Sequence, residues 1–191
     1  MPGEGGGKAG SCGRETVGSE IRVVDEDGNS VAPGEVGEMV IGGDGIMKGY
    51  WKAPKATAEA LKGGCLYTGD LATIDEEGYI YPLERKKDTI ISGGEKVFPR
   101  DVEDVLYLHP SVLEAAVVGV PNEESGESVK AIVALRQGRQ ATQEEIIRFC
   151  EQYLSSRAVP RCVEFVDELP KSSMGKILRR VLREQHPHRP K

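Results

Sequence analysis

The pattern of apolar and polar positions changes character near residue 90. Before that point, short apolar runs alternate with polar residues and are separated by turns rich in glycine and acidic side chains. Such alternation is typical of strands that bury one face. It predicts strands over 19–25, 38–41, 71–75 and 79–82, hairpin turns at 25–29 and 76–78, an apolar patch over 46–51 and a short helix over 54–61. Together these elements predict a small, mostly antiparallel β subdomain.

After residue 88 a helical spacing becomes prominent. Residues 99–108 place three apolar side chains on one helical face. Thr142 and Glu145 have the spacing of a capping box at the start of the clearest helix, over 142–154. Further runs predict strands over 89–92, 113–120, 129–135 and 163–166, and a basic helix over 176–183. The second half is therefore predicted to be a compact α+β unit of about one hundred residues, and the fold class of the whole chain is α+β.

Composition divides the chain at the same place. Residues 1–94 hold 20 of the 24 glycines and carry 16 acidic against 10 basic side chains, whereas the remainder is balanced at 15 and 15. Within that remainder, residues 171–191 carry seven basic groups and one acidic group. An acidic protein with one basic end does not indicate a nucleic-acid partner, but the basic end suits a phosphate-bearing ligand. We expect a flexible start at 1–18, the β subdomain at 19–86, the α+β domain at 87–184 and a tail at 185–191.

Several classes of protein are disfavoured by the sequence. No run of 18 apolar residues exists, so we expect no transmembrane segment. The first residues lack a charged and then apolar signal segment, which favours a cytoplasmic location. The four cysteines are widely spaced and the three histidines lack metal-helix spacing, so we expect reduced thiols and no metal site.

Three segments near the composition break are candidates for chemistry. In Tyr-Thr-Gly-Asp at 67–70, a carboxylate at a tight glycine turn can accept hydrogen bonds from two ribose hydroxyls; the alternative is an ordinary aspartate at a turn. The charge run at 83–88 is either a solvated linker or a hinge in which Arg85 reaches a phosphate or ribose. The Ser-Gly-Gly segment at 92–94 is either a β-bulge or a place where backbone approaches a ligand closely.

A fourth candidate is Pro-Lys-Ser-Ser-Met-Gly-Lys at 170–176, which has the glycine and lysine of a phosphate-binding loop but fails that pattern. Pro170 replaces the first glycine, and Ile177 stands where a serine or threonine would bind magnesium. What is left is a flexible turn that presents Lys176 at the start of the basic helix. The other basic groups of this region either add positive charge near a phosphate or form a solvated helix face.

Taken in order, these segments resemble motifs of the adenylate-forming superfamily, which includes acyl-CoA synthetases, aryl-CoA ligases, luciferases and carrier-protein adenylation domains. The matching stretches are EVGEMVIGGDGIMKGYW at 35–51, YTGDLATIDEEGYIYPLERKKDTIISGGEKVFPRDVE at 67–103 and LPKSSMGKILRR at 169–180. The resemblance extends over about residues 11–184, and the motifs within these stretches stand in the family's order, which leaves little room for chance.

The resemblance implies nucleotide-binding and hinge roles in the region 67–103. Asp70 matches the acid that holds the ribose hydroxyls of AMP, and Arg85 matches the arginine at the ribose and phosphate region. Lys87 matches the hinge about which a C-terminal lid, here 87–184, rotates between two half-reactions. Glu84 departs from the family, which usually has glycine before the arginine.

The resemblance also implies two roles within the lid. Ser92, Gly93 and Gly94 match the loop that lines the pantetheine channel of CoA. Lys176 matches the lid lysine of the adenylation step, and its ammonium can neutralise charge where a carboxylate attacks the α-phosphate.

Other family segments are absent from the sequence. It contains neither the phosphate loop that ends in Pro-Lys nor the Tyr-Gly-x-Thr-Glu segment that cups adenine and supplies a magnesium-binding glutamate. We therefore expect the C-terminal part of an ATP-dependent acyl-CoA synthetase that lacks an N-terminal portion and is inactive alone. Its small-molecule partners would be a carboxylic acid and CoA, with ATP or AMP and with Mg²⁺ bound by residues outside this chain. The alternatives are a non-catalytic truncated lid or interaction module, and part of a carrier-protein-loading adenylation enzyme.

Trp51 is expected to anchor packing of the β subdomain.

Overall fold

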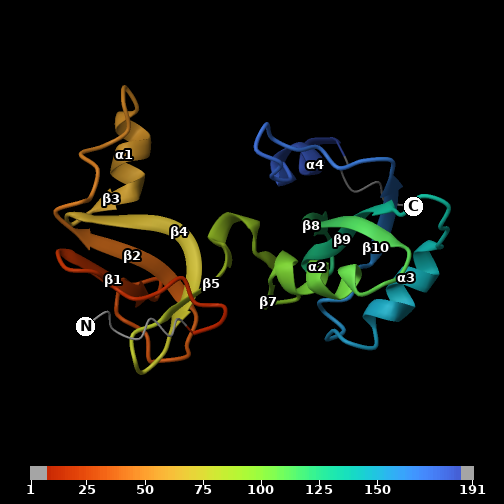
Figure 1. The fold of residues 1–191 in the computed structure, drawn as a ribbon, viewed down its shortest axis with the longest axis horizontal. Coiled ribbons are helices and arrows are strands. Elements are labelled where there is room, and N and C mark those ends of the chain that lie inside the picture. Colours follow the sequence, from red (N-terminus) through yellow and green to blue (C-terminus); the bar gives the residue numbers. More distant parts are fainter. Residues whose placement is uncertain (1–7, 186–191) are drawn as a thin grey trace, which may run out of the picture. The chain divides into compact units, whose positions relative to one another are not determined.

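The computed structural model describes residues 8–185 and divides the chain into two units, 1–87 and 88–191. Each unit contains a five-stranded sheet, and the described residues also form four α-helices (Figure 1). The predicted α+β fold class is therefore confirmed. Residues 1–7 and 186–191, which include part of the predicted start and nearly all of the predicted tail, lie outside the described residues.

Unit 1 is an antiparallel sheet centred on one long strand. Its elements are β1 (Ser19–Val24), β2 (Gly37–Gly43), α1 (Pro54–Ala60), β3 (Leu61–Lys62), β4 (Cys65–Ile74) and β5 (Ile80–Arg85). One edge of β4 pairs with β2, which in turn pairs with β1. The other edge pairs with β3 at one end and β5 at the other. Alternating side chains bury Val23, Ala72 and Ile80 on one face, which makes the small core of this unit.

Unit 2 is built on a long β-hairpin. Its elements are β6 (Ile90–Ser92), β7 (Glu95–Val97), α2 (Pro99–Tyr107), β8 (Val112–Asn122), β9 (Gly126–Leu135), α3 (Gln143–Cys150), β10 (Cys162–Val166) and α4 (Arg179–Gln185). β8 and β9 pair antiparallel along nearly their whole length. β10 adds a parallel strand on the other edge of β9, and β6 pairs with β9 at a single position.

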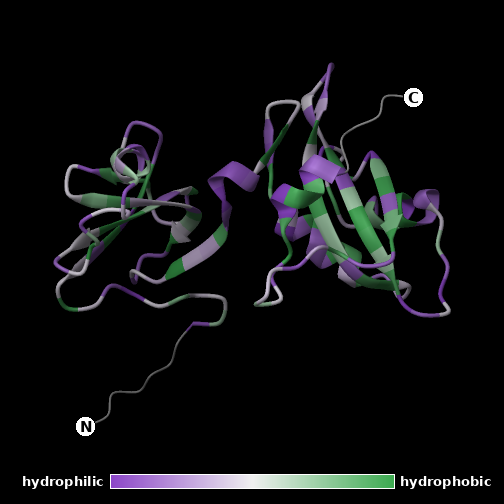
Figure 2. Cartoon of the chain, turned by 90° about the horizontal axis from the view of Figure 1, so that it is seen from above, coloured by the Kyte–Doolittle hydropathy of each residue, from purple (hydrophilic) through white to green (hydrophobic). Residues whose placement is uncertain are grey.

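The β8–β9 hairpin is buried on both faces, which explains its nearly continuous apolar sequence. On one face, α2 and α3 contribute the fully buried Val102, Leu106, Ile146 and Cys150 to the larger core. On the other face, α4 contributes Leu182, which is also fully buried. Figure 1 shows α4 on the opposite side of the hairpin from α2 and α3, and Figure 2 shows the strands between them as hydrophobic. Burial of a leucine side chain contributes about 1.5–3 kcal/mol, so this single residue supplies much of the attachment of α4.

Three loops of the chain share one hydrogen-bonding pattern. They span 25–29, 75–79 and 172–176, and each has glycine at its fourth position. In each loop the first residue's side-chain oxygen accepts from the N–H groups of the third and fifth residues. The backbone N–H of the first residue donates to the carbonyl of the fifth residue, and the carbonyl of the first residue accepts from the N–H of the glycine. The first residue is aspartate in two loops and serine in the third, which are residues that bond readily to nearby backbone. The predicted hairpin turns at 25–29 and 76–78 are confirmed.

The amino-terminal end of the described chain is tied to β5. Cys12 N–H donates to the carbonyl of Ile80 at 2.9 Å. Lys8 Nζ lies 2.6 Å from Asp75 Oδ2 and 2.8 Å from Glu77 Oε1. The hydrogen bond from Lys8 lowers the pKa of Asp75 from 3.8 to about 2, and the same partners raise the pKa of Lys8.

The structure corrects the bounds of two predicted helices. The helix predicted over 142–154 ends at Cys150 and continues as turns. Its capping box is confirmed, since Glu145 N–H donates to Thr142 Oγ1 at 3.2 Å and Thr142 N–H donates to Glu145 Oε2 at 2.8 Å. The basic helix begins at Arg179, because a β-bridge ahead of it closes the loop 172–176 and removes that segment from the helix.

Two further predictions for unit 1 are wrong. In unit 2, the structure contains one strand that the sequence does not predict. β4 begins at Cys65 rather than at residue 71, because β2 and β3 supply partners for its first residues. Trp51 is 88% exposed and so does not anchor packing. The strand β7 has no apolar alternation, since Glu95 and Lys96 are both exposed, and the sequence gives no sign of it. No helix within residues 8–185 is long and apolar enough to cross a membrane.

Candidate functional site

β4 carries a bulge at the segment that the sequence singles out. One residue of β2, between Glu38 and Val40, faces three residues of β4, 68–70. Gly69 has a φ of +72°, which favours glycine. The tight turn predicted at Asp70 is therefore a bulge within a continuous strand. Bulges change the direction of neighbouring side chains, and this one determines how Asp70 is presented.

Side chains fix the backbone of the bulge. Thr68 Oγ1 donates to the carbonyl of Met39 at 2.7 Å and accepts from the N–H of Asp70 at 3.1 Å. Glu38 Oε1 accepts from the N–H of Gly69 at 3.1 Å, and the Glu38 side chain is only 13% exposed. Two side chains, Glu38 of β2 and Thr68 of the bulge itself, therefore hold the backbone that carries Asp70.

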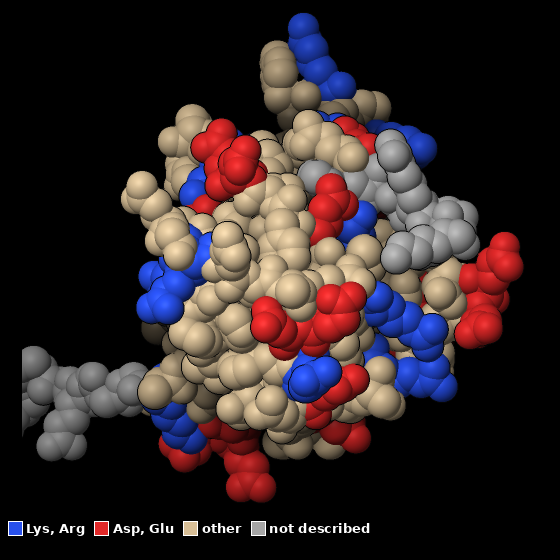
Figure 3. Space-filling view, turned by 90° about the vertical axis from the view of Figure 1, so that its right-hand side faces the viewer, with Lys and Arg blue, Asp and Glu red and all other residues tan. Residues whose placement is uncertain are grey.

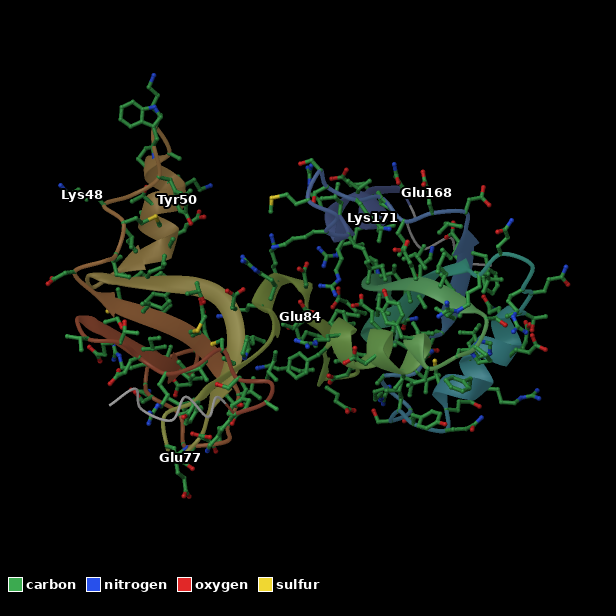
Figure 4. All side chains as sticks on the ribbon, viewed as in Figure 1. Lys48, Tyr50, Glu77, Glu84, Glu168 and Lys171 are labelled. Carbon is green, nitrogen blue, oxygen red and sulfur yellow. The ribbon has the colours of Figure 1, made fainter. Side chains whose placement is uncertain are left out.

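Asp70 faces Arg85 across the β4–β5 ladder. Arg85 Nε lies 2.7 Å from Asp70 Oδ1, and the Asp70 and Arg85 side chains are 31% and 54% exposed. A pair this exposed contributes at most about 1 kcal/mol to stability. The carboxylate can accept hydrogen bonds from hydroxyls, and the guanidinium can donate to a phosphate. Glu84 (labelled in Figure 4) accepts the N–H of Arg85 at 2.9 Å through its own carboxylate.

The chain between the two units is short and hydrophilic. A 3₁₀-helix spans Lys86–Asp88, and the boundary between the units falls after Lys87. Figure 2 shows this segment as hydrophilic, in agreement with its charge run. Lys87 is exposed, and its side chain has no ion-pair partner among residues 8–185.

The Ser-Gly-Gly segment forms a hairpin turn between β6 and β7, so the bulge interpretation is wrong. Ser92 pairs with Glu95, and Gly93 and Gly94 have φ values of +59° and +83°. Two central residues in that conformation form a type I′ turn, which glycine adopts without strain. A Cβ on Gly93 would lie 2.7 Å from the guanidinium of Arg157, whereas nothing lies within 4 Å of the equivalent point on Gly94. The turn therefore presents open backbone beside one arginine.

Lys176 is the last residue of the loop 172–176, three residues before α4, and not at the helix start as predicted. Its N–H donates to Ser172 Oγ at 3.1 Å, and its carbonyl accepts from the N–H of Ser172 at 2.8 Å. The backbone of Lys176 is thus fixed while its side chain is exposed. Within the described part of the chain, the ammonium group has no carboxylate partner.

Ion pairs hold the chain on both sides of this loop. Lys171 (labelled in Figure 4) pairs with Glu114 of β8 at 2.5 Å. Arg179, the first residue of α4, lies 2.8 Å from Glu103 Oε2, and the other oxygen of Glu103 accepts the N–H of Val117 at 2.8 Å. The loop that carries Lys176 is therefore attached to α2 and β8 by charged hydrogen bonds as well as by Leu182.

The structure joins one pair of the sequence-predicted site residues directly. Asp70 and Arg85 meet in unit 1, directly before Lys87. The 92–94 turn and Lys176 belong to unit 2, and among its described residues no hydrogen bond or ion pair joins them. Sequence reasoning missed the supporting acids Glu38 and Glu103. Their partners lie 31 and 76 residues away, so only the folded structure reveals them.

No metal-binding group was found among the described residues. Within residues 8–185, no three His, Cys, Asp or Glu side chains are arranged to hold a metal ion. Cys150 is fully buried, and burial raises the pKa of its thiol to about 11, which makes it a small apolar core residue.

On the face seen in Figure 3, acidic and basic side chains are interspersed.

Comparison with known proteins places both units in one family. The model of the AMP-binding enzyme C-terminal domain matches residues 101–176, and the AMP-binding enzyme model matches residues 2–51. A long-chain-fatty-acid–CoA ligase of Yersinia pestis is 48% identical over 177 residues, which are 93% of this chain and 31% of the relative. A 2-succinylbenzoate–CoA ligase of Geobacillus kaustophilus is 44% identical over 92% of this chain and 36% of its own length. ATP-bound MatB from Rhodopseudomonas palustris superposes with a TM-score of 0.86 at 36% identity, over 93% of this chain and 36% of that one.

Fold, motifs and relatives agree on the class of protein. The chain belongs to the adenylate-forming, AMP-binding enzyme superfamily. Within that class it corresponds to the C-terminal portion of acyl-CoA ligases, and it spans about a third of the length of the curated relatives it matches.

Proposed function

We propose that this chain supplies the ribose-holding strand and the C-terminal lid of an ATP-dependent acyl-CoA synthetase. In the first half-reaction a carboxylic acid and ATP give acyl-AMP and pyrophosphate; in the second, acyl-AMP and CoA give acyl-CoA and AMP. The observation that carries the proposal is the Asp70–Arg85 pair, held on a bulged strand just before the boundary between the units. The relatives named above are ligases of this kind.

Asp70 and Arg85 are assigned to the nucleotide. The Asp70 carboxylate accepts hydrogen bonds from the ribose hydroxyls, and the Arg85 guanidinium turns toward the ribose and phosphate region. Their mutual ion pair is exposed and weak, so exchanging it for ligand contacts costs little. The bulge supports this role because Glu38 and Thr68 fix its backbone without using either of the two side chains.

Lys176 is assigned to adenylation. When a carboxylate oxygen attacks the α-phosphorus, a new O–P bond forms and pyrophosphate leaves with the electrons of the broken P–O bond. An ammonium placed there neutralises the charge on the two anions and on the transition state without any proton transfer. The fixed backbone and unpaired side chain of Lys176 suit this task.

Residues 19–86 are then the β subdomain and residues 87–184 the lid, with Lys87 as the hinge between the two half-reactions. A hinge residue needs only to absorb backbone rotation, so lysine is acceptable there. In the second half-reaction, the turn formed by Ser92, Gly93 and Gly94 lines the channel for the pantetheine arm of CoA. Its open backbone and the steric limit at Gly93 support that assignment.

This part of the enzyme does not determine which carboxylic acid is the substrate. Relatives named for a long-chain fatty acid and for 2-succinylbenzoate match the chain at 48% and 44% identity. This similarity is expected if the acyl pocket and the Mg²⁺ ligands belong to residues outside the matched third.

A chimera tests the proposal. The matched third of the Yersinia pestis ligase is replaced by this chain, and the two half-reactions are measured separately by ATP–pyrophosphate exchange and by thioester formation from preformed acyl-AMP. Lys176→Ala should reduce exchange by at least tenfold more than it reduces thioester formation, with Arg180→Ala, at an exposed residue of α4, as the control. Equal losses in both half-reactions would argue against the assignment of Lys176.

The same proposal predicts that the 191 residues alone do not catalyse ATP–pyrophosphate exchange, because the sequence contains no phosphate loop. The purified chain is assayed beside the chimera at equal concentration. Robust exchange by the chain alone would show that the triphosphate is held by residues to which no such role is assigned.

A further inference from the structure

Two ion pairs bracket Lys87, one in each unit. On the unit 1 side, Lys86 Nζ lies 3.0 Å from Glu38 Oε2. On the unit 2 side, Arg183 of α4 pairs with Asp88. Between them, Lys87 is exposed and has no ion-pair partner among the described residues. The boundary between the two compact units falls at this same residue.

Both pairs rest on a carboxylate that is largely buried. The Glu38 and Asp88 side chains are 13% and 12% exposed, in contrast with the freely exposed pair between Arg180 and Glu184 on the same α4 helix. Glu38 is further held by the N–H of Gly69, so it connects Lys86 to the bulge that carries Asp70. Charged hydrogen bonds at sheltered carboxylates are the stronger kind, and they restrain the residues that they join.

We propose that Glu38 and Arg183 are positioning residues that confine the rotation between the units to the backbone of Lys87. Glu38 holds Lys86 to unit 1 and Arg183 holds Asp88 to unit 2. The dihedral angles of Lys87, the middle residue of the 3₁₀-helix, lie between the two restraints. The importance of this pivot for catalysis rests on the proposed function, whereas the two ion pairs are observed in this chain itself. The consequence is a rotation about one residue rather than a flexible linker of several residues.

Backbone order parameters of the ¹⁵N-labelled chain report picosecond-to-nanosecond motion, and they test without any nucleotide whether local backbone freedom is confined to Lys87. In the unaltered chain, Lys87 should fall below about 0.6 while Lys86 and Asp88 stay near 0.85, the value of rigid backbone. Glu38→Gln keeps an acceptor for the Gly69 N–H but loses the charge that attracts Lys86. It should lower the order parameter of Lys86 below about 0.6 and leave Asp88 unchanged.

Arg183→Met should do the reverse, lowering Asp88 and leaving Lys86 unchanged. The matched controls are Glu20→Gln, which breaks the exposed pair with Arg22 in the same sheet, and Arg180→Met on the same helix. Neither control should alter the order parameters of residues 85–89. Unchanged order in both test variants would overturn the proposal, as would a minimum in the unaltered chain that spreads evenly over 85–89. This last measurement decides the matter even if a variant does not fold, and a failure of nucleotide binding in the chimera leaves it unaffected.

Discussion

Replacing Leu182 by alanine tests how the lysine loop is attached to unit 2. Leu182 is fully buried against the face of the β8–β9 hairpin that carries Ala116, Val118 and Ile132. Leu→Ala at such a site costs about 2–5 kcal/mol, through lost burial and the cavity left behind. With a urea dependence of about 2 kcal/mol per molar, a loss of about 3 kcal/mol lowers the unfolding midpoint of unit 2 by about 1.5 M.

The assay is a urea titration in which backbone NMR signals report on each unit separately. Unit 1 has its own core, so its midpoint should stay within about 0.3 M of the original value. Leu178→Ala, at a residue that is 37% exposed on the same segment, is the matched control and should cost under about 1 kcal/mol. A midpoint of unit 2 that does not move, or an equal shift in both units, would refute the view that this leucine anchors α4 to a separate core.

Two further predictions concern the shared loops. The folded pKa of Asp75 is about 2 and its ordinary value is 3.8, so its contribution to stability is present above about pH 4 and is lost as the pH falls through 2. The midpoint temperature of thermal unfolding of unit 1 should therefore fall less steeply between pH 5 and pH 2 in Asp75→Asn than in the unaltered chain. Parallel curves of midpoint against pH would contradict this. Ser172→Ala removes the acceptor of two backbone N–H groups, at roughly 1 kcal/mol each, and should raise amide exchange at Lys176 by about tenfold. Ser172→Asp should preserve the protection, because aspartate makes the same loop at 25 and 75; exchange as fast as in the alanine variant would contradict the common geometry.

Local chemistry made part of the fold predictable. The loops at 25–29 and 76–78 were predictable because an aspartate and a glycine at fixed spacing satisfy each other's backbone within five residues. The capping box at Thr142 was predictable for the same reason. The strands β8 and β9 follow from apolar composition alone, since both faces of the hairpin are buried.

Long-range pairing made the rest unpredictable. The bulge at Gly69 exists because β2 sets the register of β4 from 31 residues away, and no local signal fixes that register. The helix expected from 176 starts later, because the bridge between Lys171 and Ile177 competes with helical hydrogen bonds. For the candidate site, the motifs pointed to Asp70, Arg85 and Lys176 as chemical groups, but they carried no information on the acids that hold the backbone around them.

Acidic side chains of unit 2 also distinguish the basic groups near the C-terminus from one another. Lys171, Arg179, Arg180 and Arg183 each pair with a carboxylate of unit 2. Lys176 alone among the basic residues of 171–183 has no such partner in the described part of the chain. A basic cluster without these acids would attract any anion, and its field would be spread over five side chains. The other four are paired, so Lys176 is left with an unpaired ammonium on a backbone held by Ser172, which supports its proposed role in positional and electrostatic catalysis at a phosphate.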